Sequence, residues 1–189
     1  MSDKAASGKN IVLGVSGSIA AYKACSILRG LMRRGHDVRV VMTEAAQELV
    51  GPATFRSLSG SPVATGLWLA EERAGLVHIR LAEWVDVLAI APATANIIGK
   101  VTNGIADEIL STTWMACDCP KLLAPAMNDC MWNSAAVREN VDRLREREGV
   151  EFVNPVGGML ASGKMAGTGH LAPVDEVVDA IDQLARVPE

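Results

Sequence analysis

Short apolar runs that alternate with stretches of helical period are the feature that most constrains how this chain folds. Five runs are apolar enough to form strands buried on both faces of a sheet, at residues 11–15, 38–42, 85–91, 121–124 and 150–153. Apolar residues recur at helical spacing between and after these runs, at residues 19–34, 44–50, 96–116, 134–148 and 174–185. Strands separated by helices build a parallel sheet with right-handed crossovers. The sequence therefore predicts a single α/β domain, a three-layer doubly wound parallel sheet of the Rossmann-like or flavodoxin-like kind.

Composition argues against several classes of function. Of 189 residues, 49% are hydrophobic, which is enough to bury a sizeable core. The formal net charge of −4 has the wrong sign for a protein that binds nucleic acid through a basic face. No apolar run approaches the roughly 20 residues that span a bilayer, and residues 1–10 contain no apolar signal segment. We therefore expect a cytoplasmic protein that binds neither nucleic acid nor membranes.

The cysteines do not indicate a metal centre. They are spaced neither as a disulfide framework nor as zinc knuckles, at Cys25, Cys117, Cys119 and Cys130. Cys117 and Cys119 could supply two ligands, but no nearby cysteine or histidine completes a tetrahedral set. No metal site is expected.

Residues 157–173 break the alternating pattern. The segment is rich in glycine and has no apolar periodicity, so we expect a loop without secondary structure. A loop of this length is unusual in a compact domain and is often a functional lid. The alternative is a surface excursion with no function.

Candidate ligand-binding segments follow the predicted strands, because ligands of open parallel sheets bind at the carboxyl ends of the strands. After the first strand, Gly17 and Ser18 open a helix whose backbone N–H groups suit a phosphate. Thr43 follows the second strand and offers a hydroxyl for a second phosphate contact. The segment lacks the three-glycine dinucleotide fingerprint and the acidic residue that grips a ribose. A mononucleotide therefore fits better than NAD.

Two later segments and one histidine complete the candidate site. Small residues at 91–96 would let a flat ring approach the backbone, and Thr94 and Asn96 could either bond that ring or cap the next helix. Residues 125–132 predict an apolar pocket in which Asn128 is the hydrogen-bonding side chain. His78 lies in an apolar stretch, where a lone histidine is more often structural than catalytic.

In combination these motifs resemble a known family. Gly-Ser-Ile-Ala at 17–20, the mid-chain His78, Pro-Ala-Thr-Ala-Asn at 92–96 and Pro-Ala-Met-Asn-x-x-Met-Trp at 125–132 occur in one order. Together they resemble the homo-oligomeric flavin-containing cysteine decarboxylases, over residues 10–185. The last motif is highly specific, and it argues against the related flavin prenyltransferases, which share the fold.

The resemblance implies a cofactor, a set of site residues and an assembly. FMN would be held by Gly17, Ser18, Ile19 and Thr43 at its phosphate and ribityl chain and by Thr94, Ala95, Asn96 and Ala126 at its ring system. Catalysis would depend on His78, which acts on the thiol, and on Asn128, which bonds the substrate carboxylate. The substrate would be contacted by Asn128, Met131, Ser162 and Met165.

The family assembles as homotrimers, some of them joined into dodecamers, with each FMN at a subunit boundary. His78 would then face a flavin held largely by the neighbouring subunit. We therefore expect a flexible tail at residues 1–9 and a flavoprotein domain at 10–187 that includes the lid loop at about 157–173.

The implied reaction is an oxidative decarboxylation. The flavin oxidises the cysteine CH₂–SH to a thioaldehyde, whose C=S group accepts the electrons left when CO₂ departs, and the product is an enethiol. In the coenzyme A branch, which acts on phosphopantothenoylcysteine, a lid cysteine then protonates the product during its reduction. Ser162 stands where that cysteine is expected, and a serine hydroxyl is a far weaker acid.

Two substrate branches and one non-catalytic role remain open. Ser162 narrowly favours a peptidyl-cysteine decarboxylase, which releases a peptide aminoenethiol and needs no such donor. The alternative is a phosphopantothenoylcysteine decarboxylase, which the segment 49–63 resembles. A flavin-binding regulatory subunit is a third hypothesis, and the presence of His78 and Asn128 argues against it.

Overall fold

The computed structural model describes residues 8–68, 76–159 and 165–186. Its main sheet is parallel, with strands in the order β3-β2-β1-β4-β5-β6. The strands are β1 (Asn10–Val15), β2 (Asp37–Met42), β3 (Val63–Ala64), β4 (Val87–Ala93), β5 (Lys121–Pro125) and β6 (Val150–Phe152). The order reverses at β1 and β4, as in doubly wound nucleotide-binding folds. The predicted fold class is confirmed.

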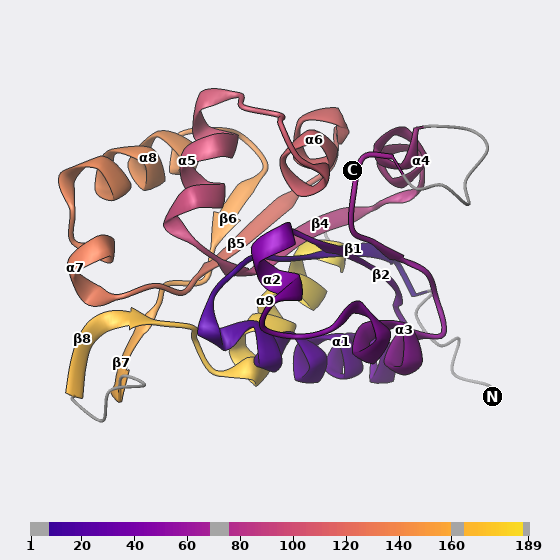
Figure 1. Ribbon diagram of the computed structural model, residues 1–189, viewed down its shortest axis with the longest axis horizontal. Helices are drawn as coiled ribbons and strands as arrows, with labels where there is room; N and C mark the ends of the chain where they lie inside the picture. The colour runs from indigo at the N-terminus through magenta and orange to yellow at the C-terminus, as the bar shows by residue number, and fades with distance from the viewer. Residues whose placement is uncertain (1–7, 69–75, 160–164, 187–189) are drawn as a thin grey trace.

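Helices cover both faces of the sheet (Figure 1). One face packs against α1 (Ala24–Arg33), α3 (Pro52–Ser59) and α9 (Val174–Arg186). The other packs against α4 (Val77–Trp84), α5 (Ala95–Asn103), α6 (Ile109–Ala116) and α8 (Ala135–Arg145). Every residue of β4 is buried, because this central strand is covered on both faces.

Several helices differ from the predicted ranges. The first predicted helix is divided into a 3-10 helix, η1 (Ile19–Lys23), and α1, and the range 96–116 holds two helices, α5 and α6. The range 44–50 shortens to α2 (Glu44–Gln47). The sequence pattern did not reveal β3, α3, α4 or the short α7 (Asp129–Trp132). These elements bury few side chains, and α4 buries only Val77 and Leu81, so they leave little hydrophobic periodicity in the sequence.

The expectation of an irregular loop at 157–173 is wrong for the described part of that segment. An antiparallel hairpin is formed by β7 (Val156–Met159) and β8 (Met165–His170), and it projects beside α7 (Figure 1). Glycine-rich strands carry too few side chains to show an alternating pattern, which explains why the sequence did not reveal them. Its role as a lid stays a prediction.

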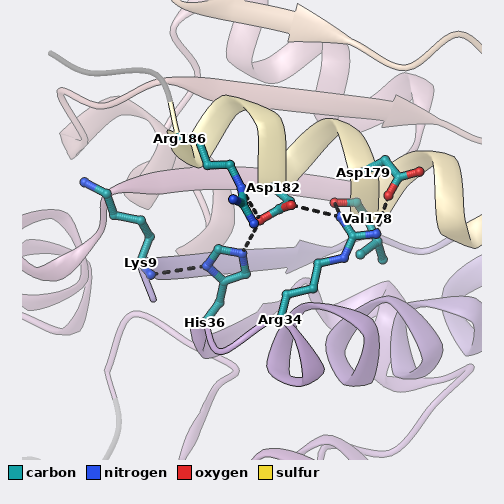
Figure 2. Close-up of polar contacts among 7 residues, drawn as sticks. All are labelled: Lys9, Arg34, His36, Val178, Asp179, Asp182 and Arg186. Atoms are coloured by element: carbon teal, nitrogen blue, oxygen red, sulfur yellow. Dashed lines mark hydrogen bonds and ion pairs between the residues drawn. The ribbon is translucent and has the colours of Figure 1, made fainter. Parts of the chain in front are cut away.

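A cluster of polar side chains connects α9 to the chain just before β2, at the amino end of the sheet (Figure 2). The carboxylate of Asp182 bonds His36 Nε2 at 3.0 Å, Arg34 at 3.1 Å and Arg186 at 3.1 Å. The backbone N–H of Lys9 donates to Nδ1 of His36 at 3.2 Å, so Nε2 is the nitrogen that carries a proton toward Asp182. Residues 1–7 of the predicted tail lie outside the described residues, whereas Lys9 is held by this contact.

Within the described residues, no helix is long and apolar enough to cross a membrane.

Candidate active site

Four of the polar residues singled out by the sequence are helix N-caps at one edge of the sheet. Each follows a different strand: Ser18 caps η1, Thr43 caps α2, Thr94 caps α5 and Asn128 caps α7. In every case the side-chain oxygen accepts a hydrogen bond from a backbone N–H of the helix that it caps. The hydroxyl or amide hydrogens of these side chains are therefore left to donate to a ligand.

A largely apolar cavity of about 550 Å³ opens beside η1 and α7. It is lined by Gly17, Ser18, Ile19, Ala20, Tyr22, Lys23, Thr94, Ala126, Met127, Asn128, Met131, Gly169, His170 and Leu171. We call it the apolar cavity.

A second cavity of about 520 Å³ adjoins it and shares Gly17, Thr94 and Met131 with it. Its other lining residues are Ser16, Thr43, Glu44, Ala45, Asn96, Ile97, Lys100, Asp107 and Glu108. We call it the polar cavity.

Two of the three carboxylates in the polar cavity are already engaged. A hydrogen bond and the positive charge of Lys100, whose Nζ lies 2.7 Å from Asp107, hold the pKa of that carboxyl below its ordinary value. Glu108 caps α6 by accepting the N–H groups of Leu110 and Ser111 at 3.0 and 2.6 Å. These pairings reduce the negative charge that an anionic ligand would meet in this cavity.

Ser16 joins the two loops between which the cavities lie. Its buried hydroxyl donates to the carbonyl of Pro92 at 2.8 Å and accepts the N–H of Thr94 at 2.9 Å. Both hydrogen-bonding functions of the side chain are used, so the end of β1 is fixed against the end of β4.

The β7–β8 hairpin is docked on the residues around Asn128. The N–H of Met127 donates to the carbonyl of Gly169 at 2.8 Å. A Cβ on Gly169 would lie 2.5 Å from the carbonyl oxygen of Met127, so only glycine permits this approach. The hairpin thereby contributes His170 to the wall of the apolar cavity.

Most of the predicted site residues come together at these cavities. The apolar cavity contains Ser18, Ile19, Ala126 and Asn128, the polar cavity contains Thr43 and Asn96, and both contain Gly17, Thr94 and Met131.

Four predicted residues are not placed at the cavities. Ala95 packs against the core cluster on the α5 side of the sheet. His78 lies on α4 and lines neither cavity, and its buried Nδ1 has no hydrogen-bond partner within the described residues. Met165 begins β8, and Ser162 lies outside the described residues.

Several residues that line the cavities or join their walls were not predicted from the sequence. Ser16 could have been found from its place beside Gly17, because a serine at a strand end often joins neighbouring loops. Lys23 and Lys100 carry no motif of their own, and the fold alone brings them to the cavities.

The paired cavities fit the two halves of FMN. The apolar cavity offers small and apolar walls of the kind that a flat ring system requires. The polar cavity offers the hydroxyl of Thr43 and the amide of Asn96 near the start of η1. Gly17 lines both cavities, and a Cβ there would come within 2.5 Å of the Cβ of Ala45, so glycine allows α2 to pack closely against this junction.

No group of three or more histidine, cysteine, aspartate or glutamate side chains that could hold a metal occurs within the described ranges. The absence of a metal stays a prediction.

Comparison with known proteins agrees with this geometry. A family model described as Flavoprotein matches residues 2–186. The chain is 42% identical over 170 residues to the coenzyme A biosynthesis bifunctional protein CoaBC of Bacillus subtilis, which covers 90% of this chain and 41% of that protein. The chain thus spans about two fifths of the length of the curated relatives that it matches.

Two solved structures extend the comparison. The FMN-dependent cysteine decarboxylase SpaF superposes with a TM-score of 0.77 and 34% identity, covering 94% of this chain and 97% of that one. A cysteine-to-serine mutant of PPC decarboxylase, complexed with pantothenoylaminoethenethiol, superposes with a TM-score of 0.83 and 28% identity, covering 95% and 100%. Both structural neighbours are thus decarboxylases, SpaF an FMN-dependent one, and the chain belongs to the Flavoprotein family.

Proposed function

We propose that this chain catalyses the FMN-dependent decarboxylation of the cysteine unit of phosphopantothenoylcysteine (PPC). The observation that carries the choice of substrate is the similarity to the CoaBC proteins, at 42% and 44% identity over about nine tenths of this chain. Ser162 by itself narrowly favours a peptide substrate. The curated relatives support the alternative better.

Asn128 is proposed to hold the carboxylate that leaves as CO₂. Its Oδ1 accepts the N–H of Cys130 at 2.8 Å, which fixes the orientation of the side-chain amide. The NH₂ group is then free to donate to a carboxylate at the wall of the apolar cavity. Two methionines flank this amide, Met127 and Met131, and they would keep the substrate thiol in a poorly hydrated environment.

FMN, when bound, supplies the two-electron oxidation of the substrate CH₂–SH that makes decarboxylation possible. His78 is proposed to take up the thiol proton. Because His78 lies on α4, away from both cavities of its own chain, it would act on a site of a neighbouring copy in a homo-oligomer. FMN would then lie at a subunit boundary, in a trimer or a dodecamer of trimers.

The β7–β8 hairpin is proposed to cover the substrate. It is anchored through Gly169 beside Asn128, and Ser162, which lies outside the described residues, falls between β7 and β8 in the sequence. A serine in the lid would donate a proton less readily than a cysteine, so the enethiol would persist longer before reduction. The enethiol complex of the cysteine-to-serine mutant of PPC decarboxylase supports this expectation.

A peptidyl-cysteine decarboxylase is the second candidate. It is supported by the 34% identity to the cysteine decarboxylase SpaF over nearly the whole of both chains. A peptide with a C-terminal cysteine would present the same thiol and carboxylate to Asn128.

Product analysis by mass spectrometry separates these candidates. The FMN-loaded protein would be incubated with PPC and, in parallel, with a peptide that ends in cysteine. We expect loss of CO₂ from PPC, either alone or together with two hydrogens if the enethiol is released unreduced. Turnover of the peptide but not of PPC would contradict the proposal and establish the second candidate.

A further inference from the structure

Cys117 and Cys119 form a pair of thiols at the end of the sheet opposite the cavities. They follow α6 and precede Lys121, the first residue of β5, whereas Asn128 follows the other end of that strand. Neither cysteine lines the apolar or the polar cavity. Both are free thiols, Cys117 buried and Cys119 partly exposed. The proposed function therefore gives this pair no role.

Lys121 fixes the segment that carries the two cysteines. Its Nζ donates to the carbonyl of Cys117 at 2.8 Å and to that of Cys119 at 3.0 Å. The same ammonium group lies 5.7 Å from the centre of the buried Trp114 ring. A positive charge is thus held beside both cysteines, and a neighbouring lysine favours the thiolate, which is the reactive form of a cysteine.

The surroundings give the two thiols different acidities. A hydrogen bond between them raises the pKa of Cys117 and lowers that of Cys119. Burial raises the pKa of Cys117 further. For Cys119, the charge of Lys121 and a backbone hydrogen bond from Leu88 help to lower the pKa against the effect of burial. Cys119 is therefore the nucleophilic thiolate of the pair, and Cys117 is a protonated thiol beside it.

The spacing of the pair suits a disulfide better than a metal. The Cα atoms of residues two apart in a chain are separated by at most roughly 7 Å, and a disulfide requires about 4.4–6.8 Å. No third histidine, cysteine, aspartate or glutamate joins the two thiols in a possible metal site in the part of the chain that the structure describes. A disulfide between residues so close in sequence constrains the unfolded chain little, so it would be redox-active rather than structural.

We propose that Cys117 and Cys119 are a redox-active pair that a peroxide converts reversibly into an intramolecular disulfide. The partly exposed Cys119 meets the oxidant, and the buried Cys117 needs only to reach its neighbour. This modification site is separate from the decarboxylase site, so the inference does not depend on the proposed function.

The reaction has two steps. The Cys119 thiolate attacks hydrogen peroxide and the O–O bond breaks, so that one oxygen stays on Cys119 as a sulfenic acid and the other leaves as hydroxide, which is protonated to water. The Cys117 sulfur then forms the S–S bond, and the sulfenic oxygen leaves as water with the Cys117 proton. Two thiols are oxidised by two electrons, one peroxide is reduced to two waters, and a dithiol reductant reverses the change by thiol–disulfide exchange.

Mass spectrometry tests the pair directly. Trypsin should release both cysteines in one peptide, residues 101–121, and separate them from Cys25 and Cys130. The FMN-loaded protein would be treated with hydrogen peroxide, alkylated with iodoacetamide in denaturant and digested. We expect the 101–121 peptide to lose two hydrogens and to carry no alkyl group, while the Cys130 peptide is still alkylated. Dithiothreitol before alkylation should restore two alkyl groups.

Variants assign the two roles. Cys117→Ser should leave Cys119 as a sulfenic acid that a 1,3-dione probe traps, whereas Cys119→Ser should leave Cys117 reduced. Lys121→Met should slow disulfide formation roughly threefold to tenfold, because each unit of thiol pKa changes the thiolate fraction up to about tenfold, and Lys121→Arg should keep the rate. Cys130→Ser is the matched control, because it removes an exposed thiol and should leave the disulfide unchanged.

Three results would overturn the inference. The first is a 101–121 peptide with two alkylated cysteines after a peroxide dose that oxidises Cys130. The second is a disulfide that joins Cys119 to another copy of the chain instead of to Cys117. The third is a rate of disulfide formation that changes neither in Lys121→Met nor in the urea-unfolded wild type, because the fold would then not activate the pair.

Discussion

At the scale of single residues, the site is built from side chains that serve the fold and the ligand at once. The four N-caps each use an oxygen to satisfy a helix start, which orients the remaining hydrogens toward the cavities. From the sequence, helix capping and ligand binding by Thr94 are alternatives. The structure shows the capping contact and places the same side chain at both cavities, so the two roles are compatible.

Asn128→Asp should separate these two roles. Aspartate also caps helices well, so the fold and FMN binding should be kept. The change replaces the amide donor with a negative charge that repels the substrate carboxylate, and we expect the KM to rise at least roughly tenfold. Steady-state kinetics with PPC measure the effect, and Asn128→Ser is the uncharged control, which should raise the KM less. An unchanged KM would remove Asn128 from carboxylate binding.

Gly169→Ala should disturb the docking of the hairpin. The added methyl group would lie 2.5 Å from the carbonyl oxygen of Met127, so β8 must shift away from Asn128. A displacement of about 1 Å near reacting groups can reduce a rate roughly 100-fold, so we expect kcat to fall by up to that factor. Gly167→Ala in the same strand is the control, because its methyl group would meet Asp129 at an ordinary 3.6 Å. Equal activity of the two variants would show that the docking does not matter.

At the scale of elements, α9 depends on a charged cluster as well as on apolar packing. Asp182 is buried, and three positive or hydrogen-bonding partners surround its carboxylate (Figure 2). Burial alone would raise the pKa of Asp182, but the hydrogen bonds and positive charges of these partners outweigh burial and lower it. The ionised carboxylate therefore stabilises the attachment of α9 to the amino end of β2.

Asp182→Asn should destabilise the protein in a pH-dependent way. At neutral pH we expect a loss of about 1–3 kcal/mol in the free energy of unfolding, because asparagine offers its partners one neutral acceptor oxygen in place of two charged ones and adds an NH₂ group that faces their donors. Since the folded pKa lies below the ordinary value of about 3.9, the contribution is complete above that pH and is lost as the pH falls through the folded pKa. Urea unfolding at several pH values measures this.

The prediction is tested by comparing how the free energy of unfolding of wild type and of Asp182→Asn changes at acidic pH. The wild type should lose stability below about pH 4 more steeply than Asp182→Asn, because only the wild type must protonate a stabilised carboxylate there. Asp179→Asn is the control, because its exposed carboxylate pairs with Arg34 at the surface and should contribute less. Parallel pH profiles for wild type and Asp182→Asn would contradict this account.

At the scale of the whole molecule, the position of His78 makes an assembly of subunits testable. The proposed function requires His78 from one copy and Asn128 from another, because His78 lines neither cavity of its own chain. His78→Asn should lack turnover, Asn128→Asp should turn over little at a PPC concentration well below its raised KM, and both variants should still bind FMN. Mixed after denaturation and refolded together, they should regain about one quarter of the wild-type activity, as random pairing in a cyclic trimer predicts.

No recovery of activity in verified mixed oligomers would place both residues in one subunit or remove one of them from the reaction. The oligomers would be verified with a tag on one variant, and each variant refolded alone serves as the control.

The sequence by itself determined the layers of the fold and the chemical class of the site. Strands β1, β2, β4, β5 and β6 and helices α1, α8 and α9 lie close to their predicted ranges, because burial on one or both faces imposes a local hydrophobic period. The family followed from the motifs around Gly17, Thr94 and Asn128, whose residues are near one another in the sequence.

Only the tertiary structure decided which residues share a cavity. Lys23, Thr94, Asn128 and His170 lie tens of residues apart in the chain, and no local pattern records that they meet at one sheet edge. The β7–β8 hairpin was not predicted because its glycines show no alternation of apolar and polar side chains. Its position beside Asn128 depends on a backbone hydrogen bond between Gly169 and Met127, which the sequence does not reveal. Local periodicity follows from the burial of each element, whereas a cavity follows from how distant elements pack, and that information lies in the fold.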